Sequence, residues 1–429
     1  MRLARVAAFL VLSPLLLVVS VRAQCGSSST STTWSDGNGS WAVSSNWTSG
    51  LPNDSTLYAC ILDGTSTVTL DTGESILGLQ LASGNGLNIN TSGGLNMFGG
   101  PKSPTGIRNS GTINNIGGIS VAQSELTNSG QLNNSGAIGL SLSGLENSGN
   151  LNNSGAAIIN IEGPITNSGT VNNSGTINQY YFGGIDPQFT NSGIINNSGT
   201  LSNSGTLNNS GTVNNSGTIN NSVGTFMNSG NVTISSAGLF TTTLDNNYIQ
   251  TAGSTILDGT LTATGDATIV DIQGGILGGT GTINGNVLMA GTMMPGDAPG
   301  TLTIIGNYEQ TSTGIFYEQM SPYSQAFLDV SGNVVLDQGA MLEIALLNGY
   351  DPLGQTISIM DFSALSGQFA NGSSFWDDGY LWDITYRQHE IDVSAVQAPE
   401  PSSLLLLFIG ITALAFYAHR KMDKTESLA

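Results

Sequence analysis

Charged side chains are scarce in this chain of 429 residues. Only 9% of the residues are Asp, Glu, Lys or Arg, and 29 acidic residues outnumber 9 basic ones, so the net charge is −20. An ordinary soluble domain carries about 25% charged residues. Clustered Lys and Arg are what a protein needs to displace counterions from phosphates, so nucleic acid is excluded as a partner. The same scarcity excludes a coiled coil, which requires Glu and Lys in bulk.

The few basic residues are also unevenly placed. Between residues 23 and 419 only Lys102, Arg108 and Arg387 are basic, so the body of the chain is acidic with almost no cation to pair its carboxylates. Such a surface repels phosphate-bearing partners and admits divalent cations and neutral polymers. The aspartates are scattered, and neither an EF-hand loop nor a Gly-Gly-x-Gly-x-Asp repeat is present. We therefore expect no defined metal site and no cofactor.

Histidine is almost absent, which limits catalytic chemistry. The chain has 2 histidines, of which only His389 lies outside the C-terminal tail. It has no Gly-x-Ser-x-Gly elbow and no His-Glu-x-x-His motif, and a zinc site would need more His or Cys than are present. We interpret His389 as a solvated surface residue, and we expect that the protein is not an enzyme.

The N-terminal residues 1–23 have the parts of a secretory signal peptide. The first five residues contain two arginines, residues 7–21 are mainly apolar, and small or tolerated residues precede a cleavage point between Ala23 and Gln24. This order predicts export from the cytoplasm and removal of the segment.

Cys25 and Cys60 are the only cysteines of the chain. Lipid attachment at Cys25 is an alternative to ordinary cleavage, but Gln24 before it is neither small nor apolar. Export places both cysteines in an oxidising compartment, where we expect them to form a disulfide. Closing that loop would stabilise the fold by roughly 4 kcal/mol. The absence of a Cys-x-x-Cys spacing argues against redox chemistry.

The C-terminal residues combine three features in a fixed order. Pro399-Glu400-Pro401 is followed by the apolar run 404–418 and then by Arg420-Lys421. Fifteen residues span about 22 Å as a helix, which is short for a bilayer core of roughly 30 Å. Over about 25 residues this tail resembles the PEP-CTERM sorting domain, which exosortases process in Gram-negative bacteria. The resemblance implies an exosortase partner, inner-membrane anchoring through residues 404–418 during sorting, and delivery to the cell surface or an exopolysaccharide-containing matrix.

A repeat of six residues dominates the middle of the chain. Its units read apolar–Asn–Asn–Ser–Gly–Thr with little variation, and in the most regular part the Asn-Ser-Gly motif begins at Asn191, Asn197, Asn203, Asn209 and Asn215. Upstream, the motif occurs in pairs, and successive first members are spaced 19, 19, 20 and 24 residues apart. No period of 3.6 residues exists, and Gly, Asn, Ser and Thr are weak helix formers.

The repeat predicts a single-stranded parallel β-helix. One apolar residue in six suits a short strand followed by a turn, and three such units would form one coil. Stacked coils would place apolar residues over one another in a core and asparagines over one another in hydrogen-bonded ladders. We expect the Gly of each unit to occupy a corner at positive φ. A disordered low-complexity segment is the alternative, but the apolar position is almost never lost.

The second half of the chain carries a further resemblance. Residues 278–310 contain Met294-Pro295-Gly296 and Ala298-Pro299-Gly300, and apolar residues alternate within residues 327–372. Over about 120 residues this region is similar to the passenger region of autotransporter-like surface proteins. The resemblance implies a right-handed β-helix, whereas the strict hexads alone also suit a left-handed one.

Tryptophans mark the predicted N-terminal end of the solenoid. Trp34, Trp41 and Trp47 lie in a strand-poor stretch rich in Gly and Ser. An open solenoid end exposes strand edges and core, so we interpret these residues as a cap. An aromatic platform that stacks on sugar rings is the alternative.

A secreted polysaccharide-degrading β-helix enzyme is the alternative to a non-catalytic protein. Such enzymes carry clustered carboxylates in a groove. The best cluster here combines Asp377, Asp378 and Asp383 with Trp376 and Trp382. It lies near the C-terminal end rather than on a repeating face, so we interpret it as part of a closing cap.

These observations predict an all-β, exported protein of structural or adhesive function, associated with exopolysaccharide or biofilm. The expected divisions are a signal peptide (1–23), a Trp-rich N-terminal cap (24–57), solenoid repeats (58–235), continuing passenger-like β-helix (236–310), a C-terminal β region and cap (311–396), and a sorting tail (397–429) with a transmembrane segment (404–418).

Overall fold

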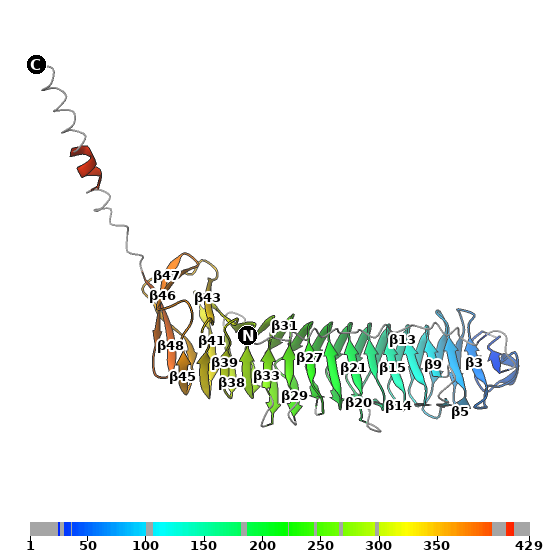
Figure 1. Ribbon diagram of the computed structural model, residues 1–429. Helices are drawn as coiled ribbons and strands as arrows, with labels where there is room; N and C mark the ends of the chain where they lie inside the picture. Colours follow the sequence, from blue (N-terminus) through cyan, green and yellow to red (C-terminus); the bar gives the residue numbers. More distant parts are fainter. Residues whose placement is uncertain are drawn as a thin grey trace, which may run out of the picture.

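The protein forms a long rod of stacked β-strands (Figure 1). This structure is a computed structural model, and it describes residues 25, 30–35, 37–99, 106–181, 187–221, 223–243, 247–265, 269–296, 300–396 and 409–415. The predicted cleavage point between Ala23 and Gln24, the motif Pro399-Glu400-Pro401 and the pair Arg420-Lys421 lie outside the described residues.

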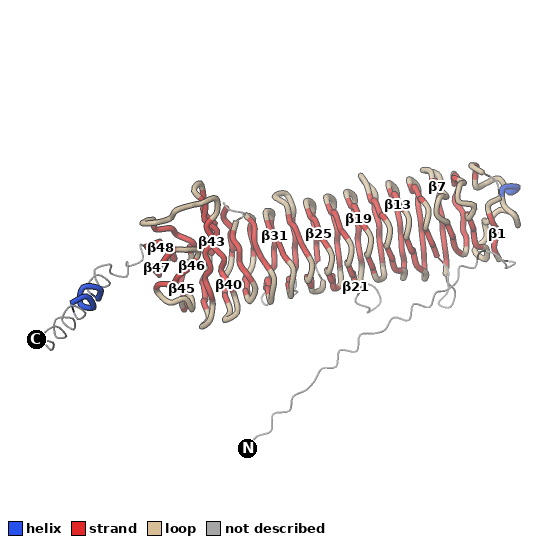
Figure 2. The backbone as a smooth tube through the Cα atoms, turned by 90° about the horizontal axis from the view of Figure 1, so that it is seen from above, coloured by secondary structure: helices blue, strands red, loops and turns tan. Residues whose placement is uncertain are grey.

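Three parallel sheets form the faces of the rod, with strands lying across its long axis (Figure 2). Sheet 1 has 16 strands: β1 (Ser31–Thr33), β3 (Tyr58–Ile61), β6 (Gly78–Leu81), β9 (Gly106–Asn109), β12 (Glu125–Asn128), β15 (Gly144–Asn147), β18 (Ile165–Asn167), β21 (Gln188–Asn191), β24 (Thr206–Asn209), β27 (Phe226–Asn228), β30 (Tyr248–Gln250), β33 (Ile269–Ile272), β36 (Asn286–Met289), β39 (Tyr308–Gln310), β42 (Asn333–Leu336) and β45 (Ala364–Gly367).

Sheet 2 contains the next strand of each coil. Its members are β2 (Gly39–Ser40), β4 (Thr67–Leu70), β7 (Gly86–Ile89), β10 (Thr112–Asn115), β13 (Gln131–Asn134), β16 (Asn150–Asn153), β19 (Thr170–Asn173), β22 (Ile194–Asn197), β25 (Thr212–Asn215), β28 (Asn231–Ile234), β31 (Ser254–Leu257), β34 (Ile276–Gly279), β37 (Thr292–Pro295), β40 (Ile315–Ser321) and β43 (Met341–Leu346).

Sheet 3 completes the coil. Its parallel members are β5 (Gly73–Ile76), β8 (Gly94–Phe98), β11 (Gly118–Ala122), β14 (Ala137–Ser141), β17 (Ile158–Ile161), β20 (Thr176–Gln179), β23 (Thr200–Asn203), β26 (Thr218–Asn221), β29 (Leu239–Thr243), β32 (Thr260–Thr264), β35 (Thr282–Asn284), β38 (Gly300–Ile305), β41 (Ser324–Val330) and β44 (Thr356–Asp361). The antiparallel strands β48 (Glu390–Val396), β47 (Tyr380–Tyr386) and β46 (Ser374–Asp377) extend it in that order.

The strand pairing confirms the predicted parallel β-helix. In the regular region each strand pairs with the strand three places further along the chain, so one six-residue unit makes one side of a coil. Ile195 of β22, for example, lies beside Val213 of β25, one coil and three units later. The sixteen strands of sheet 1 are separated by fifteen spacings of about 4.8 Å, which gives a rod about 72 Å long. The handedness of the helix stays a prediction.

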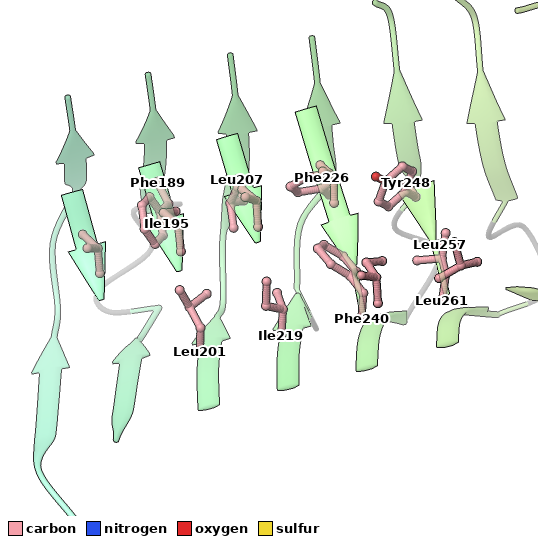
Figure 3. Close-up of a cluster of buried hydrophobic side chains, with 14 of the residues drawn as sticks. Phe189, Ile195, Leu201, Leu207, Ile219, Phe226, Phe240, Tyr248, Leu257 and Leu261 are labelled. Carbon is pink, nitrogen blue, oxygen red and sulfur yellow. The ribbon is translucent and has the colours of Figure 1, made fainter. Parts of the chain in front are cut away.

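The core of the rod is built from apolar columns. In a typical unit of four strand residues the second and fourth face inward, so each strand contributes an apolar side chain and a corner residue. Figure 3 shows one column in sheet 1, in which Phe189, Leu207, Phe226 and Tyr248 stack coil on coil. Phe240 from sheet 3 meets this column with its ring centroid 4.7 Å from that of Phe226. Aromatic pairs packed edge to face in this way stabilise the core beyond the burial of their surface.

The glycines of the Asn-Ser-Gly motif do not have the predicted conformation. Apart from Gly155, they lie outside the set of glycines with positive φ, so the expected left-handed corner is wrong. Their place is set by close contact between coils. A Cβ on Gly211 would lie 2.1 Å from the carbonyl oxygen of Gly193, one coil earlier. No side chain fits in that space, which explains the Gly at each turn without left-handed geometry.

The N-terminal end is closed by tryptophans and a disulfide. Trp34, Trp41 and Trp47 are 2%, 0% and 3% exposed and belong to the same apolar cluster as the core. The rings of Trp34 and Trp41 both contact that of Trp47, at centroid distances of 5.0 and 4.8 Å. Rings buried in this way offer no free face to a sugar. The loop that holds them contains the short 3-10 helix η1 (Ser44–Asn46).

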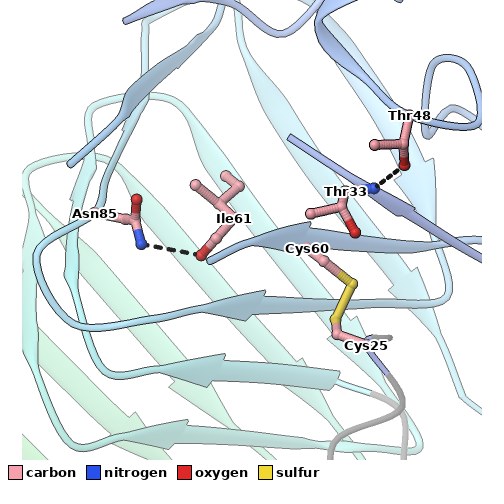
Figure 4. Close-up of a disulfide and its surroundings, with 6 residues drawn as sticks. All are labelled: Cys25, Thr33, Thr48, Cys60, Ile61 and Asn85. Carbon is pink, nitrogen blue, oxygen red and sulfur yellow. Dashed lines mark hydrogen bonds between the residues drawn. A yellow bond between two sulfur atoms is a disulfide. The ribbon is translucent and has the colours of Figure 1, made fainter. Parts of the chain in front are cut away.

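The disulfide joins Cys25 to Cys60 of β3, with the two Cα atoms 5.9 Å apart (Figure 4). It ties the chain before β1 to the second strand of sheet 1. Thr33 of β1 lies beside Cys60 in the parallel pairing, and its backbone N–H donates to Thr48 in the tryptophan loop. The disulfide therefore lies directly under the N-terminal cap.

The C-terminal end departs from the parallel pattern. β40 and β41 form an antiparallel hairpin that links sheets 2 and 3, and β46, β47 and β48 continue antiparallel from β44. Trp382 of β47 and Phe369 are completely buried and belong to the same apolar cluster as the core of the rod. The antiparallel strands thus cover the last parallel coils.

Residues 409–415 form a helix near the end of the chain. Within the part of the chain that the structure describes, no helix has both the length and the apolar character needed to cross a membrane. Residues 404–408 and 416–418 lie outside that part, so the transmembrane segment 404–418 stays a prediction.

Candidate functional site, the outer asparagine row

Asparagine side chains form continuous ladders inside two corners of the rod. In the first, which follows sheet 1, the side-chain amide of Asn109 donates to the oxygen of Asn128 at 2.7 Å, and each later member repeats the bond. Its members are Asn109, Asn128, Asn147, Asn167, Asn191, Asn209 and Asn228. The second, which follows sheet 2, contains Asn115, Asn134, Asn153, Asn173, Asn197 and Asn215.

The buried ladders are structural because their donors are used internally. The side-chain amide of Asn128 also donates to the backbone oxygen of Asn150 at 3.0 Å. The same hydrogen bond recurs along the ladder. Both ladders are 0–2% exposed. A buried amide that is satisfied in this way fixes the vertical register of the coils and has no free donor for a ligand.

A different set of asparagines lines the outer face of sheet 2, and we call it the outer asparagine row. Its members are Asn88, Asn114, Asn133, Asn152, Asn172, Asn196 and Asn214, one from each of seven successive coils. Neighbours are hydrogen-bonded at 2.7–2.8 Å. At about 4.8 Å per coil the row is about 29 Å long.

The outer row runs opposite to the buried ladders. Asn172 donates to Asn152 and accepts from Asn196, so each amide points toward the N-terminal end of the rod. In the buried ladders each amide points toward the C-terminal end. The outer side chains are half-buried or exposed, which leaves their remaining hydrogen-bonding groups facing water.

Each member of the outer row that has a neighbour on both sides presents one free donor and one free acceptor to solvent. An Asn side chain has two amide hydrogens and two lone pairs on its oxygen. Asn152, Asn172 and Asn196 each use one hydrogen and one lone pair along the row. The row therefore repeats the same donor and acceptor at every coil.

The row borders a shallow groove of about 390 Å³. The lining consists entirely of asparagine and serine, from the outer row, the neighbouring corner and the turn: Asn152, Asn153, Ser154, Asn172, Asn173, Ser174, Asn196, Asn197, Ser198, Asn214, Ser216 and Ser235. No charged or aromatic side chain lines it. Such a surface suits a neutral, hydroxyl-rich partner that lies along the rod and makes many weak bonds.

The predicted carboxylate cluster is brought together at the C-terminal end, but two of its three carboxylates bind backbone. Asp377 accepts a hydrogen bond from the backbone N–H of Ile344 at 2.7 Å, and Asp378 accepts one from that of Leu346 at 2.5 Å. These bonds join the β46–β47 hairpin to β43. Asp383 accepts from the hydroxyl of Ser374 at 2.5 Å.

The two tryptophans of that cluster have opposite environments. Trp382 is buried, and its ring N–H donates to the backbone oxygen of Asp377 at 3.1 Å. Trp376 is 63% exposed. Sequence reasoning grouped them because they are close in the chain, yet the alternation of neighbouring strands points one inward and the other outward.

His389 lies at the surface near the last strand. Its Nδ1 atom is 3.0 Å from the backbone oxygen of Ser363. Beside it, Arg387 forms ion pairs with Glu390 at 3.2 Å and with Asp392 at 2.8 Å. The charge of Arg387 is thus paired within its own hairpin. The contacts of His389 and Arg387 are those of a structural turn. Among the described residues no group of three or more His, Cys, Asp or Glu has the arrangement of a metal site.

The fold and its polar row define the class of this chain, which is a parallel β-solenoid protein. No protein-family model matches it, and no curated protein does either. Among solved structures it is similar to the crystal structure of the Haemophilus influenzae Hap adhesin, with 12% sequence identity and a TM-score of 0.27. The match covers 79% of this chain and 61% of the adhesin chain.

Proposed function

We propose that the protein is an exported, non-catalytic rod that binds a neutral polysaccharide outside the cell through the outer asparagine row. The carrying observation is the groove beside that row, which has an uncharged lining of asparagine and serine over several coils. In this proposal the rod has a structural or adhesive function in an exopolysaccharide matrix or biofilm.

The chemistry of the row favours hydroxyl groups as ligands. A sugar hydroxyl both donates and accepts one hydrogen bond, which matches the free donor and acceptor of each inner row member. A single bond of this kind contributes only about 0.5–1.5 kcal/mol. Repetition along about 29 Å of rod makes the contact useful, because linked weak sites bind as a multivalent unit. The net charge of −20 disfavours an anionic polymer.

The address of the protein belongs to the same proposal. The signal peptide 1–23, the motif Pro399-Glu400-Pro401 and the basic pair Arg420-Lys421 support export, exosortase processing and delivery to the surface or matrix of a Gram-negative cell. The apolar run 404–418 would hold the protein in the inner membrane until processing. Replacing Glu400 with Ala should leave an unprocessed protein in the membrane fraction, and normal release of this variant would contradict exosortase sorting.

Retention on the exopolysaccharide of the producing cell tests the binding step. Replacement of Asn152, Asn172 and Asn196 with Ala should abolish retention of the full chain. The matched control replaces Asn160, Asn178 and Asn220, which occupy the equivalent outer position of sheet 3. Equal retention of both variants, or no retention of the wild type, would rule out the row as a glycan site.

The non-catalytic part of the proposal has a separate readout. Asp377 and Asp378 already accept backbone hydrogen bonds that fasten the C-terminal hairpin. A catalytic carboxylate would need to be free to exchange a proton or attack the sugar. Release of reducing ends from the exopolysaccharide, lost on Asp377→Asn or Asp378→Asn, would establish the enzyme alternative instead.

A further inference from the structure

The outer position that carries the asparagine row continues to the C-terminal end of sheet 2. Register carries it from Asn214 through Thr233, Ile256, Gly278 and Met294 to Tyr317 and Glu343. Tyr317 lies five coils beyond Asn214, or about 24 Å at about 4.8 Å per coil. Amides occupy the first part of this line, and its last members are Met294, Tyr317 and Glu343.

This line ends in a second cavity, of about 470 Å³, which we call the C-terminal cavity. Its floor is the outer face of β40 and β43, and its wall is the β46–β47 hairpin, which lies beside β43 in Figure 1. The residues that matter for its chemistry are Tyr317, Met341, Glu343, Asn371 and Trp376.

The cavity combines an aromatic surface with hydrogen-bonding groups. Trp376 is 63% exposed, and Tyr317 lines the same hollow. The face of a hexopyranose ring carries C–H groups that pack on an aromatic ring, while its edge carries hydroxyls. Glu343 supplies a carboxylate for those hydroxyls, and Asn371 adds a polar rim. This is the usual composition of a small-molecule site, apolar with a few placed polar groups.

The wall of the cavity is held in place. Asp377 and Asp378 bind the backbone N–H groups of Ile344 and Leu346 on β43, so the hairpin cannot swing away without breaking two charged hydrogen bonds. Trp376 precedes this pair directly, so its backbone is held in place with the hairpin. A preformed aromatic surface binds a ring without a large ordering cost.

We propose that the C-terminal cavity is a second sugar site, which takes neutral hexopyranose rings of the polymer that lies on the outer row. The inference rests on the proposed function for the identity of the polymer, but the cavity has its own ligand and its own test. The row binds hydroxyls along a chain, and the cavity binds ring faces at the end of the same line.

Trp376 gives this site a specific optical readout. Of the 5 tryptophans, Trp34, Trp41, Trp47 and Trp382 are at most 3% exposed, so Trp376 dominates quenching by acrylamide. The probes are neutral hexasaccharides of glucose, galactose, mannose and N-acetylglucosamine, each added to the full chain. At least one should lower the quenching constant by about half, because a bound ring covers the indole face.

Variants locate the binding. Tyr317→Ala and Glu343→Gln should each lower the affinity for the hexasaccharide that protects Trp376 by about tenfold. The matched control is Tyr323→Ala, since Tyr323 is 92% exposed at the tip of the β40–β41 hairpin and lies outside the cavity, and it should change nothing.

The outcomes separate the two proposals. Oligolysine is added as a basic probe for comparison. If no neutral hexasaccharide protects Trp376 from quenching, or if only oligolysine protects it, the cavity is not a sugar site. The proposal that the outer row retains the polysaccharide would still stand. If a hexasaccharide protects Trp376 and the exopolysaccharide is not retained, the cavity site stands and the proposed function fails.

Discussion

Two adjacent asparagines in one repeat unit occupy different environments. In the unit Ile195-Asn196-Asn197, the apolar residue faces inward, so Asn197 also faces inward and Asn196 faces out. The sequence predicted ladders of asparagine from the strict period. It did not predict that inner and outer ladders run in opposite directions, because that depends on which backbone oxygens of the next coil receive the second amide hydrogen.

The buried and outer asparagines should contribute differently to the free energy of unfolding. Asn191→Ala removes the acceptor of Asn167 and a donor to Asn209, and leaves both partners buried without that bond. This should lower the free energy of unfolding by about 1–3 kcal/mol. Asn196→Ala, on the outer row, should change it by about 0.5 kcal/mol or less. Chemical denaturation of both variants measures the difference, and equal losses would contradict the internal role of the ladder.

Glu318 is the one buried acidic residue of β40. Its side chain is 0% exposed, and its backbone pairs with that of Ile344 in the parallel sheet. Apart from a weak interaction with the backbone N–H of Ala326, neither carboxylate oxygen has a hydrogen-bond partner among the described residues. Burial raises the pKa of Glu318 well above its ordinary value, more than the backbone N–H of Ala326 lowers it. The folded protein therefore holds this proton more tightly than the unfolded chain does.

A raised pKa makes the fold less stable as pH rises. The contribution of Glu318 is fully present below about pH 4.3, the unfolded value, and is lost as pH rises toward the folded pKa. Glu318→Gln keeps the shape without the ionisation, so it should raise the melting temperature at pH 8 and leave it nearly unchanged at pH 4. A variant that melts below the wild type at pH 8 would show that the carboxylate is ionised and stabilised in the fold.

At the level of the element, the turn is more constrained than its residues suggest. Ser and Gly at a fixed place indicate a corner, and the corners are found there. The reason for Gly, however, is the neighbouring coil and not the local φ, as the contact of Gly211 with the Gly193 oxygen shows. A single unit of sequence contains no information on what lies one coil away, so this reason required the register.

Gly211 and Gly139 form a matched pair for this argument. Gly211→Ala places a methyl group against backbone, which cannot move aside, and should cost about 1–3 kcal/mol. A Cβ on Gly139, on the outer face of β14, meets nothing within 4 Å, so Gly139→Ala should be neutral or slightly stabilising. Urea midpoints of the two variants compare them directly. Similar midpoints would mean that the coils can separate at the turn.

At the scale of the whole molecule, the sequence predicted the solenoid but not the alignment of its two cavities. The six-residue period carries the coil, because every strand repeats the same apolar position. Asp377, Asp378 and Trp376 were recognised as a cluster near the C-terminal end. The cavity that Trp376 lines lies at the end of the outer asparagine row only because a whole number of coils separates the two. The sequence does not reveal this number, because the coils between them are irregular, as in the step of 22 residues from Asn228 to Gln250.

Deletions of whole units test this alignment. Removing residues 192–209 takes out β22, β23 and β24, one strand from each face, so the row and the C-terminal cavity stay on the same side of a rod that is shorter by about 4.8 Å. Removing residues 204–209 takes out β24 alone. Three strands make a coil, and these units are nearly identical. After the loss of one strand, every strand that follows the deletion should therefore join the neighbouring sheet instead of its own.

The two deletion variants should fold equally well and differ in binding. Both keep the apolar columns, so their circular dichroism and melting should resemble the wild type. In the variant without residues 192–209, a long neutral polysaccharide can still reach the outer row and Trp376 together, and its affinity should stay within about threefold of the wild type. In the variant without residues 204–209, the two sites face different sides, so affinity for the polymer should fall about tenfold or more, while a hexasaccharide still protects Trp376. Equal affinity of both variants for the polymer would show that the row and the cavity do not act on one chain.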